Sequence, residues 1–265
     1  MNNLNAASGI SWIQRGWQIF KQQPAELLSL FGFYFFVLML IEQIPWVGAV
    51  VSFLLMPALS FAFFEGARRI RDKQRVNSRL LFTGLQPGVV KPLLNLGLVL
   101  VLTSVLAGVA FQWFDDGELF KYLEATKSPE SKPPLPNGKI FQGFFAAMLV
   151  YAPVLMAMWL AGPLIVWQKM RVVKAMFYSF FACLKAWAAL LVFGIVFFGL
   201  ASVLSSTLIT IVALLIGSQK VLMVVAFFFL IAVMTLLHCS FYPAYVDIFG
   251  EPEALPDDAA NGLAP

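Results

Sequence analysis

The stretch Leu27–Arg79 reads LLSLFGFYFFVLMLIEQIPWVGAVVSFLLMPALSFAFFEGARRIRDKQRVNSR, and it decides the fold. From Leu27 to Phe64, Glu42 is its only charged residue. The apolar part is long enough for two membrane-spanning helices, because a bilayer core takes about 20 helical residues. We place the break at Glu42–Pro45, since a proline ends a helix and a charge prefers the headgroup region. The stretch therefore predicts a transmembrane hairpin with spans at Pro24–Gln43 and Pro45–Phe64.

A dense run of basic residues follows the hairpin: Arg68, Arg69, Arg71, Lys73, Arg75 and Arg79. Cationic loops next to membrane spans stay in the cytoplasm. With both termini inside, 13 Lys and Arg residues lie on the cytoplasmic side and 5 lie outside. We therefore predict cytoplasmic N- and C-termini. The same six side chains are candidate contacts for anionic lipid headgroups or a partner, since each interfacial Lys or Arg contributes about 1 kcal/mol of attraction.

The composition is that of a membrane protein. Hydrophobic residues make up 60% of the chain and charged residues 12%, about half the share of a soluble domain. The net charge of +4 reflects topology in so apolar a chain, and we expect no nucleic-acid partner. Two cysteines (Cys183 and Cys239, placed near the cytoplasm) and one histidine make neither a disulfide nor a zinc site, so we predict no metal and no cofactor.

Four further spans follow the hairpin. The third is expected at Pro92–Phe114, the fourth at Ile140–Trp167 and the sixth at Val221–Tyr245. The fifth segment, Ala186–Ile216, is longer than one span needs. It is either one long helix or a helix that ends near Ser205–Thr207 before a re-entrant piece. The predicted fold class is an all-α, polytopic membrane protein with six transmembrane helices in one domain, residues 1–250.

Two hydrophilic segments stand apart from the spans. The periplasmic loop, residues 115–139, begins with a part that can form one or two helical turns. Its proline-rich second half, Ser128–Pro136, is predicted to be extended and mobile. The acidic tail, residues 251–265, is too poor in apolar residues to pack and is predicted to be disordered.

Two amphipathic segments are expected at the cytoplasmic interface. In Gly9–Gln23, apolar residues recur at helical spacing, and Trp12 and Trp17 are the predicted interfacial anchors. Lys169–Lys185 is the second such segment. Within the basic loop, residues 65–91, we also expect Leu80, Leu81, Phe82 and Leu85 to lie at the interface.

The hairpin recurs three times, at residues 9–71, 77–171 and 172–250. Each copy has a short amphipathic segment, an apolar helix and a second helix with a proline near its cytoplasmic end: Pro57, Pro163 or Pro243. Three such hairpins could pack about a pseudo-threefold axis. The alternative is that membrane helices simply tolerate proline.

Several motifs resemble an uncharacterised family of bacterial six-helix inner-membrane proteins. They are GWQIFKQQP at 16–24, LFTGLQ at 81–86, KPLLNLG at 91–97, SFFACLKAW at 179–187 and YPAYVDIF at 242–249. The resemblance covers nearly the whole chain and implies a location in the bacterial inner membrane, without implying an activity. A more distant likeness extends to the membrane domain of some glycerophosphodiester phosphodiesterases, whose catalytic domain has no counterpart here.

Ionisable groups inside the membrane are costly, so the few present are the first functional candidates. Glu65 stands three and four residues before Arg68 and Arg69, which predicts a local ion pair. His238 is the only histidine, and we expect it to make an interhelical hydrogen bond. Asn95, Ser104 and His238 form a possible intramembrane polar site.

Three hypotheses about function follow. The leading one is a non-enzymatic inner-membrane protein that binds membrane lipids or another inner-membrane protein, as a scaffold, assembly factor or accessory subunit. The competing one is a transporter or flippase for a small amphiphile, which needs a cavity lined by the polar site above. An enzyme is the least favoured class, because the chain has no HExxH, GxSxG or P-loop motif. In that third hypothesis His238 would act as acid or base on a lipid.

Overall fold

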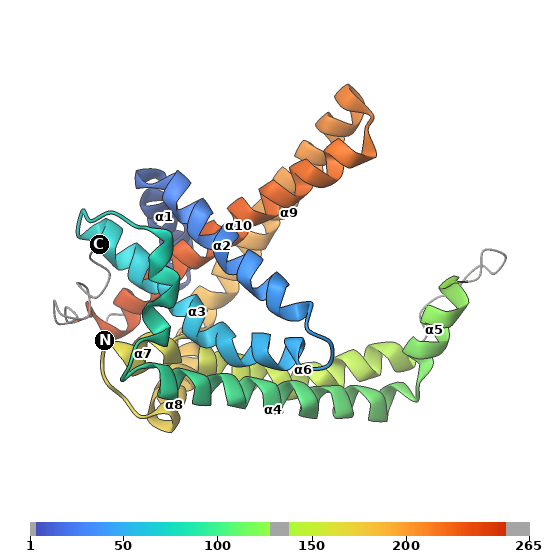
Figure 1. Cartoon of the computed structure of the whole chain (residues 1–265), viewed down its shortest axis with the longest axis horizontal. Coiled ribbons are helices and arrows are strands. Elements are labelled where there is room, and N and C mark those ends of the chain that lie inside the picture. Colours follow the sequence, from blue (N-terminus) through green and yellow to red (C-terminus); the bar gives the residue numbers. More distant parts are fainter. Residues whose placement is uncertain (1–3, 128–137, 253–265) are drawn as a thin grey trace.

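The computed structural model describes residues 4–127 and 138–252, and within these ranges all regular structure is helical (Figure 1). Six of the described helices are long and apolar enough to cross a bilayer, which confirms the all-α, six-span fold class. They are α2 (Pro24–Glu42), α3 (Gly48–Arg71), α4 (Val90–Asp115), α6 (Gly138–Trp159), α9 (Trp187–Ile216) and α10 (Gln219–Phe249).

The first hairpin turns where the sequence predicts it. Helix α2 begins with Pro24, whose missing N–H is no loss in the first turn. The turn after Glu42 contains Trp46, which has a left-handed backbone (φ 66°) and a side chain that is 98% exposed. Helix α3 then continues to Arg71, so the predicted loop at 65–91 is wrong in its first part. Glu65 pairs with arginines three and four residues ahead, which supports this last helical turn.

A short helix precedes each hairpin along the chain. These are α1 (Ala6–Gln22), the 3₁₀ helix η1 (Ser78–Leu85) and α8 (Val172–Lys185). The order of elements is thus a short helix followed by two spans, three times over. The pseudo-threefold axis stays a prediction.

Helix α1 packs against protein, and the role of Trp12 as an interfacial anchor is wrong. Trp12 is fully buried beside Trp159 and Phe193, and its Nε1 donates to Oδ2 of Asp247 at 2.9 Å. Arg15 also donates to Asp247, at 3.0 Å to Oδ1. An amphipathic pattern marks a face that avoids water, but it does not distinguish lipid from the apolar surface of another helix.

Two glycines let α1 approach the last hairpin closely. A Cβ on Gly9 would collide with the carbonyl oxygen of Ala189 in α9, and one on Gly16 would collide with Ser240 in α10. Trp17 lies on the other face of α1, half exposed and stacked on Phe20, so it is still available at the interface.

Helix η1 also belongs to the protein core. Leu80 and Leu81 are fully buried, so their predicted interfacial position is wrong, whereas Phe82 is 44% exposed. A Cβ on Gly84 would collide with the carbonyl oxygen of Ala58, which explains how η1 lies so close to α3. The loop before η1 is tied down by Gln23, whose side chain donates to the carbonyl of Gln74 and accepts from the N–H of Val76.

The predicted fourth span at Ile140–Trp167 is interrupted. Helix α6 ends at Trp159, and a separate short helix, α7 (Ala161–Val166), follows. The hydroxyl of Ser179 in α8 donates to the carbonyl of Met156 at 2.8 Å and accepts from the N–H of Leu160 at 3.1 Å. The break is stable because a neighbouring helix satisfies the backbone groups that it frees.

Helix α9 is one continuous helix of 30 residues, so no re-entrant piece begins at Ser205–Thr207. The hydroxyls of Ser206 and Thr207 donate to the carbonyl of Val203 within the same helix, which satisfies their polarity without a break. In the hydrophilic loop at residues 115–139, α5 (Glu118–Lys127) confirms the helical first half. Ser128–Pro136 and the acidic tail from residue 253 onward lie outside the described residues.

The hairpins diverge from a common region. In Figure 1 the α9–α10 hairpin points away from the α4–α6 hairpin, and the α2–α3 hairpin lies between them. Near the opposite ends of the spans, α7 and α8 lie against α6, and α1 lies against α9 and α10. The three hairpins therefore meet at one place.

Candidate functional site

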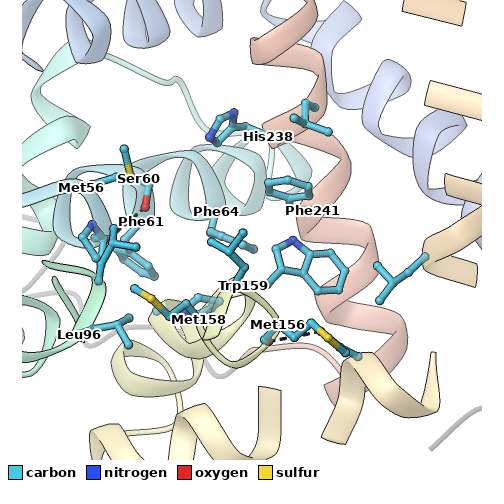
Figure 2. A pocket seen from close by; sticks show the side chains of 18 of the residues that line it. Met56, Ser60, Phe61, Phe64, Leu96, Met156, Met158, Trp159, His238 and Phe241 are labelled. Atoms are coloured by element: carbon cyan, nitrogen blue, oxygen red, sulfur yellow. Dashed lines mark hydrogen bonds between the residues drawn. The ribbon is translucent and has the colours of Figure 1, made fainter. Parts of the chain in front are cut away.

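A central cavity of about 660 Å³ lies where the three hairpins meet. All six spans contribute to its lining, together with residues of α7 and α8. In Figure 2, His238 of α10 lies on one side and Met156 and Met158 on the other, with Phe241 and Trp159 packed together between them. The volume falls within the range of about 300–1,000 Å³ that small-molecule sites occupy.

The lining is apolar and adaptable. Aromatic rings and methionines dominate it, and no Lys, Arg, Asp or Glu is among its residues in the described part of the chain. Methionine side chains suit a surface that must fit differently shaped apolar groups. The polar or weakly polar exceptions are Tyr34, Ser60, Tyr151, Cys183 and His238.

His238 is one of the few polar residues of this lining. Its Nδ1 lies 2.7 Å from the carbonyl oxygen of Met234, one turn earlier in α10, so Nδ1 carries the proton. The ring is packed among aromatic neighbours, with its centroid 4.4 Å from that of Phe63 and 5.5 Å from that of Phe31. The expected interhelical hydrogen bond of His238 is therefore wrong, because its bond is within its own helix.

Two tyrosines on the lining differ in their hydrogen bonding. Tyr151 shares a hydrogen bond of 2.9 Å with Ser104, which joins α4 to α6. Tyr34 is 8% exposed and packs on Phe31 and Phe63, in the same aromatic group as His238. The two tyrosines therefore present different chemistry: one hydroxyl is occupied, and the other lines the cavity.

The predicted polar site comes together only in part. His238 lines the cavity, and Ser104 touches the cavity wall through Tyr151. Asn95 is exposed and is not among the lining residues, so its place in the site is wrong. Sequence reasoning missed Tyr34 and Tyr151. The available signal was a hydroxyl-bearing ring in spans that otherwise use phenylalanine.

Next to the cavity lies a buried ionic cluster, the polar base, formed by Glu65, Arg68, Arg69, Asp72 and Trp167. Glu65 is fully buried and accepts from Arg68 Nη2 at 2.6 Å, Arg69 Nε at 3.2 Å and Trp167 Nε1 at 3.3 Å. This confirms the predicted ion pair. Arg68 is only 7% exposed and is also bonded to Asp72, so it is not accessible to lipid headgroups.

The rest of the basic run remains accessible. Arg71 pairs with Asp72 and with Glu251, and its guanidinium lies over the ring of Tyr242. The other three cations are exposed: Lys73 and Arg75 in the loop held by Gln23, and Arg79 at the start of η1.

Six apolar helices, a buried ionic cluster and an apolar cavity define a multi-pass helical membrane protein. The chain is similar to a "probable inner membrane protein" of Burkholderia thailandensis, with 29% identity over 256 residues that cover 94% of each chain. The protein is thus a multi-pass inner-membrane protein, and the cytoplasmic location of its termini stays a prediction. No family profile and no solved structure match the chain. The likeness to glycerophosphodiester phosphodiesterases stays a prediction.

Proposed function

We propose that this inner-membrane protein is a non-enzymatic binder of a lipid-like amphiphile, which it holds in the central cavity. The observation that carries the proposal is the cavity itself, about 660 Å³ in volume and lined by all three hairpins. Binding there would cross-link the hairpins, so occupancy would alter how firmly they are held together. That suits a scaffold or accessory subunit whose shape depends on its lipid.

The physical support is the chemistry of the lining. Inside a bilayer an alkyl chain is already out of water, so packing against the lining is what favours its entry. Aromatic residues such as Phe61, Phe64 and Trp159 offer flat apolar surfaces to such a chain. Outside the cavity, the exposed cations Lys73, Arg75 and Arg79 provide a second contact, with anionic headgroups at the interface.

Filling the cavity tests the proposal. Ser60 lies on the lining and is half-buried, so Ser60→Phe places a ring inside. In nanodiscs, an alkyl probe with a diazirine should label cavity residues in the parent protein and at least fivefold less in this variant. The matched control is Val105→Phe, which adds a ring on the exposed face of α4. Equal labelling of both variants, with thermal stability unchanged, would refute binding in the cavity.

Neutralising the exposed basic loop tests the second contact. Replacing Lys73, Arg75 and Arg79 together by Gln should weaken binding of the purified protein to soluble anionic headgroups, while cavity labelling stays unchanged. Binding that persists at low salt would remove these three residues from the proposal.

Transport of the amphiphile is the second candidate. It is favoured by one observation: Pro57 and Pro163 line the cavity, and proline weakens the helix at the point where a span would have to bend. Pro243 lines a smaller cleft of about 260 Å³ instead. A fluorescent alkyl substrate that crosses proteoliposomes faster than protein-free vesicles would favour transport, and binding without flux would exclude it.

A further inference from the structure

The cavity has the size of one alkyl chain. Its volume of about 660 Å³ lies within the range of small-molecule sites, and its apolar lining suits an alkyl chain. One chain with a small headgroup fills this space.

The charge of the lining selects against ionic headgroups. No Lys, Arg, Asp or Glu is among the described lining residues. The nearby buried guanidinium of Arg68 is already engaged by Glu65 and Asp72. An ion buried without a counter-charge pays a large desolvation cost, so a phosphate or a quaternary amine would be rejected.

Two polar atoms on one side of the cavity are left without a partner. Within the described residues, neither Oη of Tyr34 nor Nε2 of His238 has a hydrogen-bonding partner. Both rings pack on Phe31 and Phe63, so they belong to the same wall. Because Nδ1 of His238 holds the proton, Nε2 is an acceptor, whereas the hydroxyl of Tyr34 is a donor.

We propose that the cavity binds a single-chain, uncharged amphiphile whose headgroup hydroxyl accepts from Tyr34 and donates to His238. This inference rests on the proposed function and names the class of its ligand. A hydroxyl satisfies a donor and an acceptor with one oxygen, and long-chain alcohols and monoacylglycerols carry it on a single chain.

The test uses the full chain in phosphatidylcholine nanodiscs with two photoactivatable probes, a diazirine-bearing hexadecanol and the corresponding hexadecyl phosphate. Labelling is mapped by mass spectrometry, and affinity is measured by competition with unlabelled hexadecanol. Only the alcohol should label the cavity. Tyr34→Phe should weaken the affinity about three- to tenfold, the effect of one lost hydrogen bond.

Tyr151→Phe is the matched control, since it removes a hydroxyl from the same cavity that Ser104 already occupies. It should change the affinity by less than twofold. His238→Phe should weaken binding as Tyr34→Phe does, and thermal stability reports whether each variant is folded. Equal labelling by the phosphate probe, or equal effects of the two tyrosine variants, would overturn the inference and leave the proposed function intact. No cavity labelling by either probe would overturn both.

Discussion

The polar base and the central cavity are neighbouring regions, but their polar groups differ in hydrogen bonding. In the polar base, Glu65 accepts three hydrogen-bonded groups and no buried charge is left alone. In the cavity lining, Oη of Tyr34 and Nε2 of His238 have no hydrogen bond to the described part of the chain. Phe61 and Phe64 connect the two regions, because they line the cavity and also pack edge-on against Trp167 of the polar base. The difference separates the part that holds the hairpins together from the part that leaves room for a ligand.

Breaking the polar base should have the largest effect. Glu65→Ala leaves the buried guanidinium of Arg68 with only Asp72 as a counter-charge, so we expect a loss of about 3–5 kcal/mol in the free energy of unfolding. Denaturant unfolding in mixed micelles measures it. Glu42→Ala removes an exposed carboxylate and should change stability by less than about 0.5 kcal/mol. If the two variants lose the same stability, the ionic cluster does not hold the fold.

Close helix packing should give the next largest effect. A Cβ on Gly97 would collide with the carbonyl oxygen of Leu54 in α3, so Gly97→Ala should cost about 1–3 kcal/mol by pushing α4 away. Gly108, in the same helix, has nothing near its Cβ position. Gly108→Ala should therefore be neutral or stabilising by up to about 1 kcal/mol. A lower melting temperature for Gly97→Ala, with an unchanged or higher one for Gly108→Ala, would support the close packing of α4 on α3. An equal fall in both melting temperatures would contradict it.

The contact between α1 and α10 should contribute less. Trp12→Phe keeps the buried ring but removes the hydrogen bond to Asp247, and Arg15 still pairs with that carboxylate. We expect a loss of about 1 kcal/mol. Trp17→Phe, at a half-exposed position, is the control and should be neutral. A larger loss for Trp17 than for Trp12 would show that α1 is anchored by lipid after all.

The last prediction concerns chemical reactivity, not stability: the thiol of Cys183 on the cavity lining should react slowly. Burial raises the pKa of this thiol to about 12, so almost no thiolate exists near pH 8. Maleimide labelling of Cys183 in the native protein should be slow and should rise with pH without a plateau below about pH 11. A cysteine introduced at the exposed Ser78 should instead level off near pH 9. A plateau near pH 9 for Cys183 would mean that water reaches the wall freely.

Sequence patterns predicted elements well where length and charge carry the information. The spans beginning at Pro24, Pro92 and Val221 were placed within a few residues, because a bilayer requires about 20 apolar residues and charges mark the ends. Whether a predicted span forms one continuous helix was harder to predict. The break after Trp159 depends on Ser179 of another helix, and the unbroken α9 depends on hydroxyls that bond within the helix.

The sequence did not predict which side chains of a helix face other helices and which are exposed. Trp12 and Leu80 were expected at the interface but are buried, and Asn95 was expected inside but is exposed. In water, an apolar stripe identifies the face that packs. A helix in lipid can be apolar all round, so hydropathy does not say which face meets protein.

By itself, the sequence determined a six-helix inner-membrane chain of three hairpins with a basic segment after the first, because hydrophobic length and charge act locally along the chain. Only the tertiary structure decided that Glu65 and Arg68 are buried together, that the hairpins leave a cavity between them, and that Tyr34 and His238 share one wall of it. Those features arise where helices from distant parts of the chain meet, and the shape of that meeting depends on side-chain packing that no local pattern encodes.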